Sequence, residues 1–287
     1  MAGLDSEQTD FYRDEGYLLL EGVFDPALLE PLKAELADEI DEFARRAHAE
    51  GLLAELYADA PFERRLALLA AQLEEPGAIL RRMNGKLKTA GMFAILSSPP
   101  LLDIVESVIG PEILAHPQFN LRAKLPHQAA SVVPWHQDLG YLEVEATETF
   151  MVNFWIPLVD ATAENGCMEV IAGSHRLPLI EHHDGLGPAG NFKGIVDEQV
   201  PPGEQVLCPV PVGGVLLIQH KTVHRSIPNQ ADHIRWSLDL RYSDPRQPTG
   251  REDVPGFIAR SAAHPHTVAL DLGDWLEIIE AGRVNYP

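Results

Sequence analysis

Residues 234–242 read IRWSLDLRY, and the polarity of this stretch changes at every position. Side chains of a β-strand point alternately to its two faces, so the stretch predicts a strand with one apolar and one polar face. The apolar face carries Ile234, Trp236, Leu238, Leu240 and Tyr242. The polar face carries Arg235, Ser237, Asp239 and Arg241. We expect the apolar face to pack against another layer of the protein.

Shorter β-prone runs precede this strand, and Pro and Gly separate them. They cover residues 113–125, 149–158, 168–171, 205–210 and 215–219. Many short strands with turn signals between them are typical of a β-sandwich or a closed barrel. The second half of the chain is therefore predicted to be mainly β.

The first third of the chain has the pattern of helices. Asp25 is a good capping residue, and Pro26 suits a first helical position. Apolar residues then recur at spacings of three and four, which predicts one apolar stripe along a helix. These residues are Leu28, Leu32, Leu36, Ile40, Phe43 and Ala47. Further helices are expected at 62–73 and 100–109, and a short one at 273–282.

Together these patterns predict a single α+β domain, mainly β, over residues 1–287. Residues 1–112 are expected to be mostly helical support, 113–245 the barrel core and 246–287 a C-terminal extension. Residues 181–204 are rich in Gly and Pro and too long for a hairpin turn. Loops of this length inside a compact domain are commonly functional. We expect this segment to act as a lid.

The composition is that of a globular protein, but its formal net charge is −21. Such a surface repels nucleic acid and anionic membranes, so we expect neither as a partner. It also disfavours a strongly anionic substrate, unless a local basic pocket outweighs the average charge. Two cysteines, Cys167 and Cys208, give no disulfide framework. The sequence has no signal-peptide pattern and no apolar run near the ~20 residues that span a membrane, so we expect a cytoplasmic protein.

Histidines followed two residues later by a carboxylate are candidate metal ligands. Three pairs have this spacing: His48 with Glu50, His136 with Asp138, and His182 with Asp184. Side chains at i and i+2 share a face on a strand and diverge on a helix. The first pair lies in the predicted N-terminal helix, and the third opens the Gly/Pro-rich segment. Only the second follows a β-prone run, so it is the candidate pair.

A metal site of this kind needs a third ligand from elsewhere in the chain. Two histidines and one carboxylate on one face of iron(II) leave three positions for a cosubstrate and oxygen. His224 follows the predicted strand at 215–219 and is our choice for the second histidine. His220 and His127 also fit on position, and spacing alone does not decide between them.

Several motifs stand in order along the second half of the chain. They are PWHQDLGY (134–141), WIPL (155–158), NGCM (165–168), AGSHR (172–176), QHKTVHRS (219–226) and RWSL (235–238). In these motifs the chain resembles the phytanoyl-CoA dioxygenase family. The resemblance extends over residues 8–260 and is densest between 119 and 245.

The resemblance implies a double-stranded β-helix, that is, a jelly-roll or cupin-like barrel with N-terminal helices packed around it. It implies that His136, Asp138 and His224 bind Fe(II), and that 2-oxoglutarate and O2 are cosubstrates. Arg235 matches the arginine that pairs with the distal carboxylate of 2-oxoglutarate. The other residues placed near the cosubstrate are Ser226, Trp155, Asn120, Lys124 and Gln137. Two further residues are assigned to the substrate side of the pocket, Lys86 and Trp135, and the position of Trp135 beside the first ligand fits core packing equally well.

The predicted activity is therefore that of an Fe(II)- and 2-oxoglutarate-dependent dioxygenase acting on a small-molecule metabolite. Asp138 completes the ligand set where related halogenases have a small residue, so we expect hydroxylation or another oxidation through C–H abstraction. The net charge favours a neutral or weakly polar substrate. One alternative is a metal-binding cupin-type enzyme without 2-oxoglutarate, which a displaced or exposed Arg235 would favour. The other is a catalytically silent barrel that binds small molecules. The sequence indicates neither the substrate nor the oligomeric state.

Overall fold

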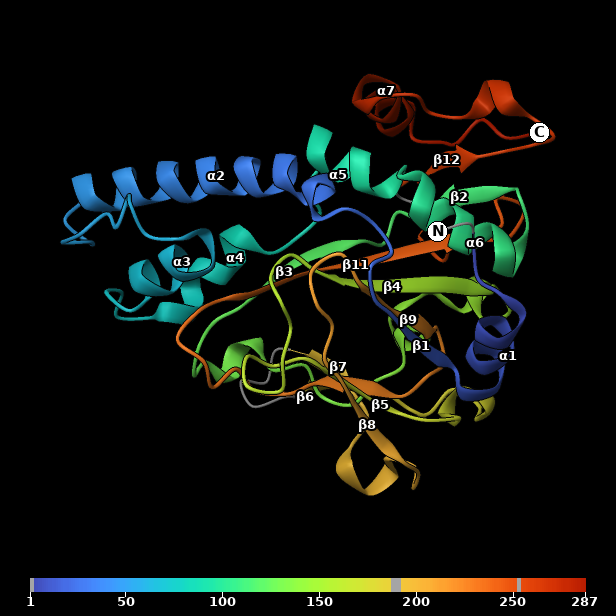
Figure 1. Ribbon diagram of the computed structural model, residues 1–287, viewed down its shortest axis with the longest axis horizontal. Helices are drawn as coiled ribbons and strands as arrows, with labels where there is room; N and C mark the ends of the chain where they lie inside the picture. Colours follow the sequence, from blue (N-terminus) through green and yellow to red (C-terminus); the bar gives the residue numbers. More distant parts are fainter. Residues whose placement is uncertain (1–2, 187–191, 252–253) are drawn as a thin grey trace.

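The computed structural model describes residues 3–186, 192–251 and 254–287 (Figure 1). Its largest element is an antiparallel sheet of seven strands. Along the sheet the order is β1 (Tyr17–Leu20), β9 (Val215–Gln219), β4 (Met151–Pro157), β11 (Arg235–Ser243), β2 (Ile113–Ala115) and β12 (Phe257–Arg260). The seventh strand, β3 (Asn120–Lys124), lies on the same side of β11 as β2. Strand β3 pairs with the first half of β11, and β2 pairs with its end. Strand β11 is thus the centre of the sheet and is the strand predicted from residues 234–242.

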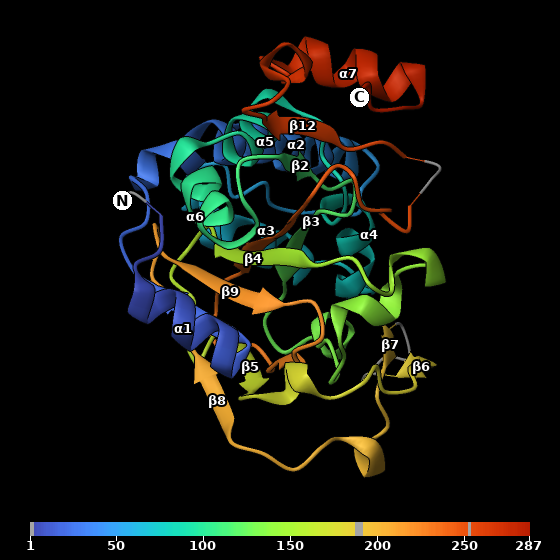
Figure 2. The ribbon, with the colours of Figure 1, turned by 90° about the vertical axis from the view of Figure 1, so that its right-hand side faces the viewer.

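A second, smaller antiparallel sheet packs against the first (Figures 1 and 2). It consists of β10 (His224–Ser226), β5 (Met168–Ile171) and β8 (Gln205–Cys208). Apolar side chains from both sheets form one cluster, which includes Trp155, Leu216, Ile218, Met168 and Val170. Among the described residues the strand pairing does not continue from one sheet into the other. The structure is therefore a two-sheet jelly roll, and the closed barrel that we considered is not formed.

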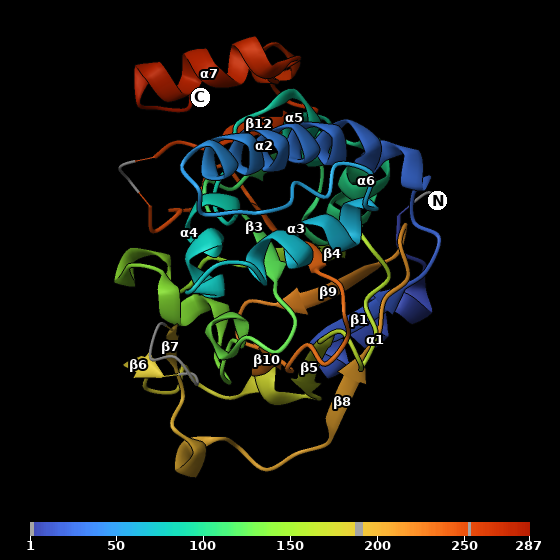
Figure 3. The same ribbon diagram turned by 90° about the vertical axis from the view of Figure 1, so that its left-hand side faces the viewer.

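Helices cover the outer face of the large sheet, as Figures 1 and 3 show. They are chiefly α2 (Glu30–Ala49), α5 (Ala90–Leu96) and α6 (Pro99–Ile109). The apolar side chains of β11 all belong to the core cluster beneath them. Trp236 stacks on Phe62 with ring centroids 5.5 Å apart, and the Tyr242 hydroxyl donates to the Leu96 carbonyl at 2.9 Å. The prediction that this face packs against another layer is confirmed.

The predicted helices are present with small shifts of their ends. The Asp25 side chain accepts from the Ala27 N–H at 2.9 Å and starts a 3₁₀ turn, Pro26–Leu29, that leads into α2. The next helix, α3 (Phe62–Ala70), is three residues shorter than predicted. The tail helix, α7 (Leu272–Ala281), ends at Gly282, which has a left-handed backbone conformation that glycine adopts without steric cost.

Some elements were not predicted. They are α1 (Ser6–Glu15), α4 (Leu80–Met83), α5, and the two outer strands β1 and β12. Strand β1 pairs with β9, nearly 200 residues later in the sequence, and β12 pairs with β2. The helical N-terminal third and the C-terminal extension therefore each add a strand to the large sheet.

Residues 90–109 form an apolar stretch that is long enough, by length and composition alone, to cross a membrane. The expectation that no run reaches this length is thus wrong. The stretch comprises α5 and α6, which are separated at Ser97 and Ser98, and half of its most apolar window is buried inside the protein. Core helices of globular proteins commonly have this composition.

The Gly/Pro-rich segment 181–204 contains a short hairpin, β6 (His183–Leu186) with β7 (Phe192–Gly194). Residues 187–191, which fall in the predicted lid, lie outside the described residues. The hairpin is attached near the candidate site, because the Tyr141 hydroxyl donates to the carbonyl of Lys193. The role of the segment as a lid stays a prediction.

Candidate metal centre

Two histidines and one carboxylate meet where the sheets approach each other. His136 and His224 form an isolated antiparallel bridge, with both N–H to carbonyl distances at 2.9 Å. Asp138 begins the 3₁₀ turn Asp138–Tyr141 just after it. One ligand atom from each of the three side chains lies within 4.8 Å of the others, and all three residues are buried. No other such group of His, Cys, Asp and Glu occurs in the described part of the chain.

Both imidazole rings are oriented by backbone carbonyls. Nδ1 of His136 lies 2.9 Å from the Pro134 carbonyl, and Nδ1 of His224 lies 2.8 Å from the Thr222 carbonyl. A carbonyl can only accept, so each Nδ1 carries the proton and each Nε2 keeps its lone pair for a metal. Burial and the neighbouring His224 lower the pKa of His136 to about 3. The neutral form required of a ligand is therefore the stable one.

Both carboxylate oxygens of Asp138 accept hydrogen bonds from strands of the large sheet. Nη2 of Arg241 donates to Oδ1 at 2.5 Å, and Nδ2 of Asn153 donates to Oδ2 at 2.6 Å. Burial alone would raise the pKa of Asp138, but the charge of Arg241 and its hydrogen bond hold it well below its usual range. The site thus presents the Nε2 atoms of two histidines and one carboxylate. This donor set suits non-haem iron(II) with open positions.

Arg241 is expected to position Asp138, the candidate carboxylate ligand. Replacing Arg241 with methionine should weaken iron(II) binding by about ten- to a hundredfold, because losing an outer partner of a ligand typically has this effect. Anaerobic titration against a chelator measures the affinity. Arg251→Met is the matched control, since Arg251 bonds Gln118 and Tyr141 rather than Asp138. Equal affinities of the two variants would contradict this role.

The other candidate histidines do not join the metal centre. His127 is exposed, and His220 is buried beside Phe150. His182 has a structural role, because its Nε2 accepts from the Gln137 N–H at 2.9 Å and its Nδ1 lies 2.7 Å from the Ile180 carbonyl. The structure therefore favours His224 over the alternatives that spacing left open.

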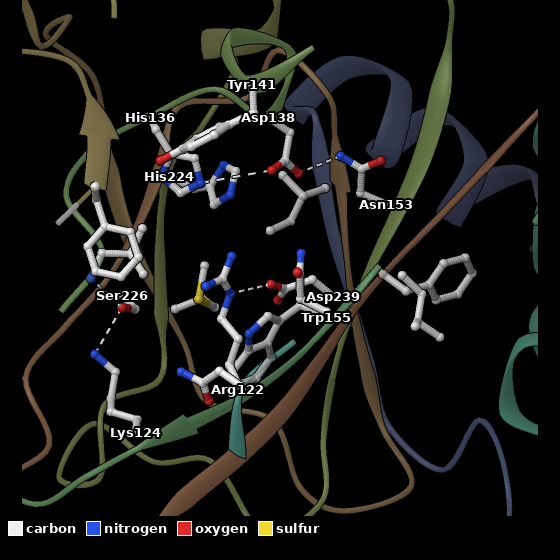
Figure 4. A pocket seen from close by; sticks show the side chains of 18 of the residues that line it. Arg122, Lys124, His136, Asp138, Tyr141, Asn153, Trp155, His224, Ser226 and Asp239 are labelled. Atoms are coloured by element: carbon white, nitrogen blue, oxygen red, sulfur yellow. Dashed lines mark hydrogen bonds and ion pairs between the residues drawn. The ribbon is translucent and has the colours of Figure 1, made fainter. Parts of the chain in front are cut away.

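A pocket with about 900 Å³ of empty space, counted to its open mouth, extends from the metal centre between the sheets (Figure 4). Its lining includes five residues that the sequence comparison placed near the cosubstrate: Arg235, Ser226, Trp155, Asn120 and Lys124. Arg235 is only 3% exposed, and its guanidinium lies 5.0 Å from the centre of the Trp155 ring. Burial lowers its pKa to about 10, so it remains charged at neutral pH.

Lys124 lies beside Arg235 in the register between β3 and β11. Its Nζ donates to Ser226 Oγ at 2.9 Å and to the Ile227 carbonyl at 2.7 Å. Burial and the charge of Arg235 lower its pKa to about 6. At neutral pH it therefore acts mainly as an uncharged donor that orients Ser226.

Three of the predicted residues do not line the pocket. Gln137 is fully buried behind it, where its side chain bonds the Lys221 carbonyl at 2.8 Å and the Ile180 N–H at 2.8 Å. It lies between two ligands on an extended chain, and alternation turns it away from them. Trp135 belongs to a separate apolar cluster and lies under the guanidinium of Arg225, 4.5 Å from the ring centre. Lys86 is exposed and lies outside the lining, near Arg241 and Arg251.

Several lining residues were not assigned to the site from the sequence. They are Arg122, Tyr141, Asn153, Asp239 and Arg241. Two of them stand on the predicted polar face of β11. Arg122 stands between Asn120 and Lys124 at the same alternate positions of β3. The alternation of polar and apolar residues could therefore have identified Arg122, Asp239 and Arg241 as pocket residues. It could not have shown which residue each of them binds.

Comparison with known proteins agrees with this geometry. Residues 12–237 match the family described as Phytanoyl-CoA dioxygenase (PhyH). A relative from Rattus norvegicus, "Phytanoyl-CoA dioxygenase domain-containing protein 1", is 26% identical over 263 residues, which cover 82% of this chain and 88% of the relative.

Solved structures share the fold. A non-heme monooxygenase, ThoJ in its apo form, superposes with a TM-score of 0.62 at 19% identity and covers 96% of this chain and 95% of its own. The epimerase SnoN, in complex with Fe3+, alpha ketoglutarate and nogalamycin RO, superposes with a TM-score of 0.54 at 21% identity over 85% of this chain and 86% of its own. The jelly roll is thereby confirmed. The chain belongs to the phytanoyl-CoA dioxygenase family and is a non-haem iron(II)- and 2-oxoglutarate-dependent dioxygenase.

Proposed function

We propose that this protein oxidises a C–H bond of a small molecule, most simply by hydroxylation, in the pocket between its two sheets. His136, Asp138 and His224 would hold iron(II), and Arg235 would bind the distal carboxylate of 2-oxoglutarate. When bound, the iron supplies the activation of dioxygen. In the overall reaction one oxygen atom enters the substrate and the other enters succinate, while C1 of 2-oxoglutarate leaves as carbon dioxide.

The observation that carries this proposal is that one pocket contains both the ligand triad and a buried arginine. Arg235 has no ion-pair partner among the described residues, although Nε donates to the Gly166 carbonyl at 3.2 Å and Nη1 donates to Ser237 Oγ at 2.5 Å. A buried cation without a counterion is costly unless a ligand supplies the negative charge. Its two neutral partners fix the guanidinium in one orientation, which suits a planar carboxylate.

The walls of the pocket would orient the substrate and exclude water. Trp155, Met168, Phe192 and Ile218 supply apolar surface between the polar groups. Tyr141 packs edge-on against the His136 ring, with centroids 5.5 Å apart, and so restricts one side of the metal centre. A small substrate would therefore approach the metal centre from a limited range of directions, which would determine the C–H bond that is oxidised.

The two alternative functions are less well supported. A cupin-type enzyme without 2-oxoglutarate would have no use for a buried, unpaired Arg235, which in this case is only 3% exposed. A binding protein without catalysis would not require two oriented histidines and a carboxylate with both oxygens hydrogen-bonded. Both alternatives predict that the protein forms no succinate.

The test is the iron-dependent conversion of 2-oxoglutarate to succinate. Metal-free protein is loaded anaerobically with iron(II), mixed with 2-oxoglutarate and oxygen, and screened against pools of small metabolites. We expect slow succinate formation without substrate and a clear stimulation by at least one pool, with succinate and oxidised product formed in equal amounts. The His224→Ala protein is the negative control. A parent protein that neither binds 2-oxoglutarate nor forms succinate would contradict the proposal.

A further inference from the structure

Arg122 places a second guanidinium in the pocket. Unlike the guanidinium of Arg235, it is paired with a carboxylate. It extends from β3 on the face that carries Asn120 and Lys124, and its Nε donates to Asp239 Oδ2 of the neighbouring strand at 2.7 Å. Among the described residues, neither of its two terminal nitrogens has a hydrogen-bond partner. The side chain is 36% exposed, although it lines an internal pocket. Its free edge therefore faces the space in which a ligand would bind.

The position of Arg122 is central in the pocket. In the view of Figure 4, the ion pair of Arg122 and Asp239 lies below the metal ligands, and Ser226 and Lys124 lie to its left. Because Asp239 accepts only from Nε, it fixes the plane of the guanidinium and leaves the two terminal nitrogens available to a ligand. A guanidinium held in this way is prepared for bidentate binding of a planar or tetrahedral oxyanion.

The cosubstrate does not require this arginine under the proposed function. One carboxylate of 2-oxoglutarate would bind the metal together with the keto oxygen, and the other would be bound by Arg235 and Ser226. Arg241, the other arginine of the lining, is already bonded to Asp138. This leaves Arg122 as the lining arginine whose terminal nitrogens are available for another ligand.

The charge of the pocket is opposite to that of the protein as a whole. The lining has three arginines, Arg122, Arg235 and Arg241, and two carboxylates, Asp138 and Asp239, while Lys124 is mainly uncharged at neutral pH. Lys86 and Arg251 lie close to this cluster outside the lining. The protein carries a net charge of −21, so its surface alone disfavours anions. A local basic pocket can outweigh that average and concentrate an anion at the site.

We propose that Arg122 binds an anionic group of the substrate, a carboxylate or a phosphoryl group, and that the enzyme therefore oxidises small organic acids. This inference rests on the proposed function and names its substrate class. The apolar part of the substrate would lie against Trp155, Met168 and Phe192, which share the pocket. The inference replaces the neutral substrate expected from the overall charge.

The test measures binding of three probes with the same phenylethyl group: 3-phenylpropanoate, 2-phenylethyl phosphate and the neutral 3-phenylpropanamide. The protein is loaded with manganese(II) and 2-oxoglutarate, and the affinity is obtained from paramagnetic broadening of the probe's proton resonances. We expect at least one acid to bind about ten- to a hundredfold more tightly than the amide, the range typical of hydrogen bonds to charged groups. The two acids distinguish a carboxylate from a phosphoryl preference.

Variants assign that preference to one residue. Arg122→Gln should remove the preference for the acid, and Arg122→Lys should recover part of it because the charge survives. The double variant Arg122→Gln/Asp239→Asn removes both charges, so that no carboxylate is left unpaired if the single variant folds poorly. Arg225→Gln is the matched control. Arg225 is 38% exposed and its Nε donates to Glu169 at 2.6 Å, but it lies outside the pocket lining.

Each other outcome overturns the inference. Equal binding of acids and amide by the parent protein, or no binding of either acid, would show that the pocket does not select anions. An Arg122→Gln protein that keeps the acid preference would assign it to another residue. If Arg122→Gln weakens 2-oxoglutarate binding by the same factor as probe binding, the arginine serves the cosubstrate. Failure of the parent protein to bind 2-oxoglutarate at all would instead contradict the proposed function.

Discussion

Replacing any one of His136, Asp138 and His224 should abolish stable iron binding. Each supplies one ligand atom to a site with three protein ligands, and the three atoms lie within 4.8 Å of one another. Loss of a residue that hydrogen-bonds a ligand already lowers metal affinity by about ten- to a hundredfold. Loss of a ligand itself should therefore lower the affinity by more than about a hundredfold. Iron content after anaerobic loading and desalting, measured by elemental analysis, is the readout.

The choice of substitution matters at Asp138. Alanine would leave Arg241 buried without its carboxylate, and breaking a buried ion pair by removing one partner costs about 3–5 kcal/mol of stability. Asp138→Asn keeps an oxygen that can accept from Arg241 and removes the charge that the metal requires. His136→Ala and His224→Ala have no such charged partner. We therefore expect all three proteins to fold and to lose iron, with circular dichroism as the check on folding.

Two nearby histidines provide matched controls. His182 and His220 are close to the centre in space but outside the ligand group, so His182→Ala and His220→Ala should retain full iron. His182→Ala should lower stability modestly instead, because the Gln137 N–H then loses its acceptor. Normal iron content in His224→Ala, or loss of iron in a folded His182→Ala protein, would show that the ligands are assigned wrongly.

The sequence predicts the central strand of the fold and the two faces of that strand. Alternation in β11 separates the core residues, such as Trp236 and Leu238, from the pocket residues Arg235 and Asp239. The same rule, that side chains two residues apart on an extended chain share a face, places His136 and Asp138 on one face. It also turns Gln137 away, so the assignment of Gln137 to the cosubstrate followed the family resemblance against the local geometry.

Long-range pairing could not be read from local patterns. Strand β1 has four residues, and its place depends on a partner strand, β9, that lies far along the chain. A run as short as YLLL fits a helix or a strand equally well. The Arg122–Asp239 ion pair likewise depends on the register in which Ser237 faces Arg122. The pattern identifies these residues as polar, but only the register makes them partners.

Arg235→Ala should weaken binding of 2-oxoglutarate by about ten- to a hundredfold, since hydrogen bonds to charged groups contribute roughly 1.5–3 kcal/mol. The guanidinium is buried, charged at neutral pH and held by Gly166 and Ser237. It therefore loses little freedom when a carboxylate binds. Arg235→Lys should recover part of the affinity, because the charge remains but the bidentate geometry does not. Anaerobic titration of the iron-loaded variants, followed by the charge-transfer absorption, measures both.

The thermal stability of the protein gives a second, independent readout. In the parent, 2-oxoglutarate neutralises a buried and unpaired cation, so it should raise the melting temperature, by an amount that grows with the logarithm of its concentration divided by its Kd. Removing that cation should leave the ligand-free protein as stable as the parent or more so, because the desolvation cost of Arg235 disappears. The shift caused by 2-oxoglutarate should then shrink in Arg235→Ala while iron content stays unchanged, since the arginine is not a metal ligand. If Arg235→Ala binds 2-oxoglutarate as tightly as the parent and shows the same shift, another residue must hold the distal carboxylate.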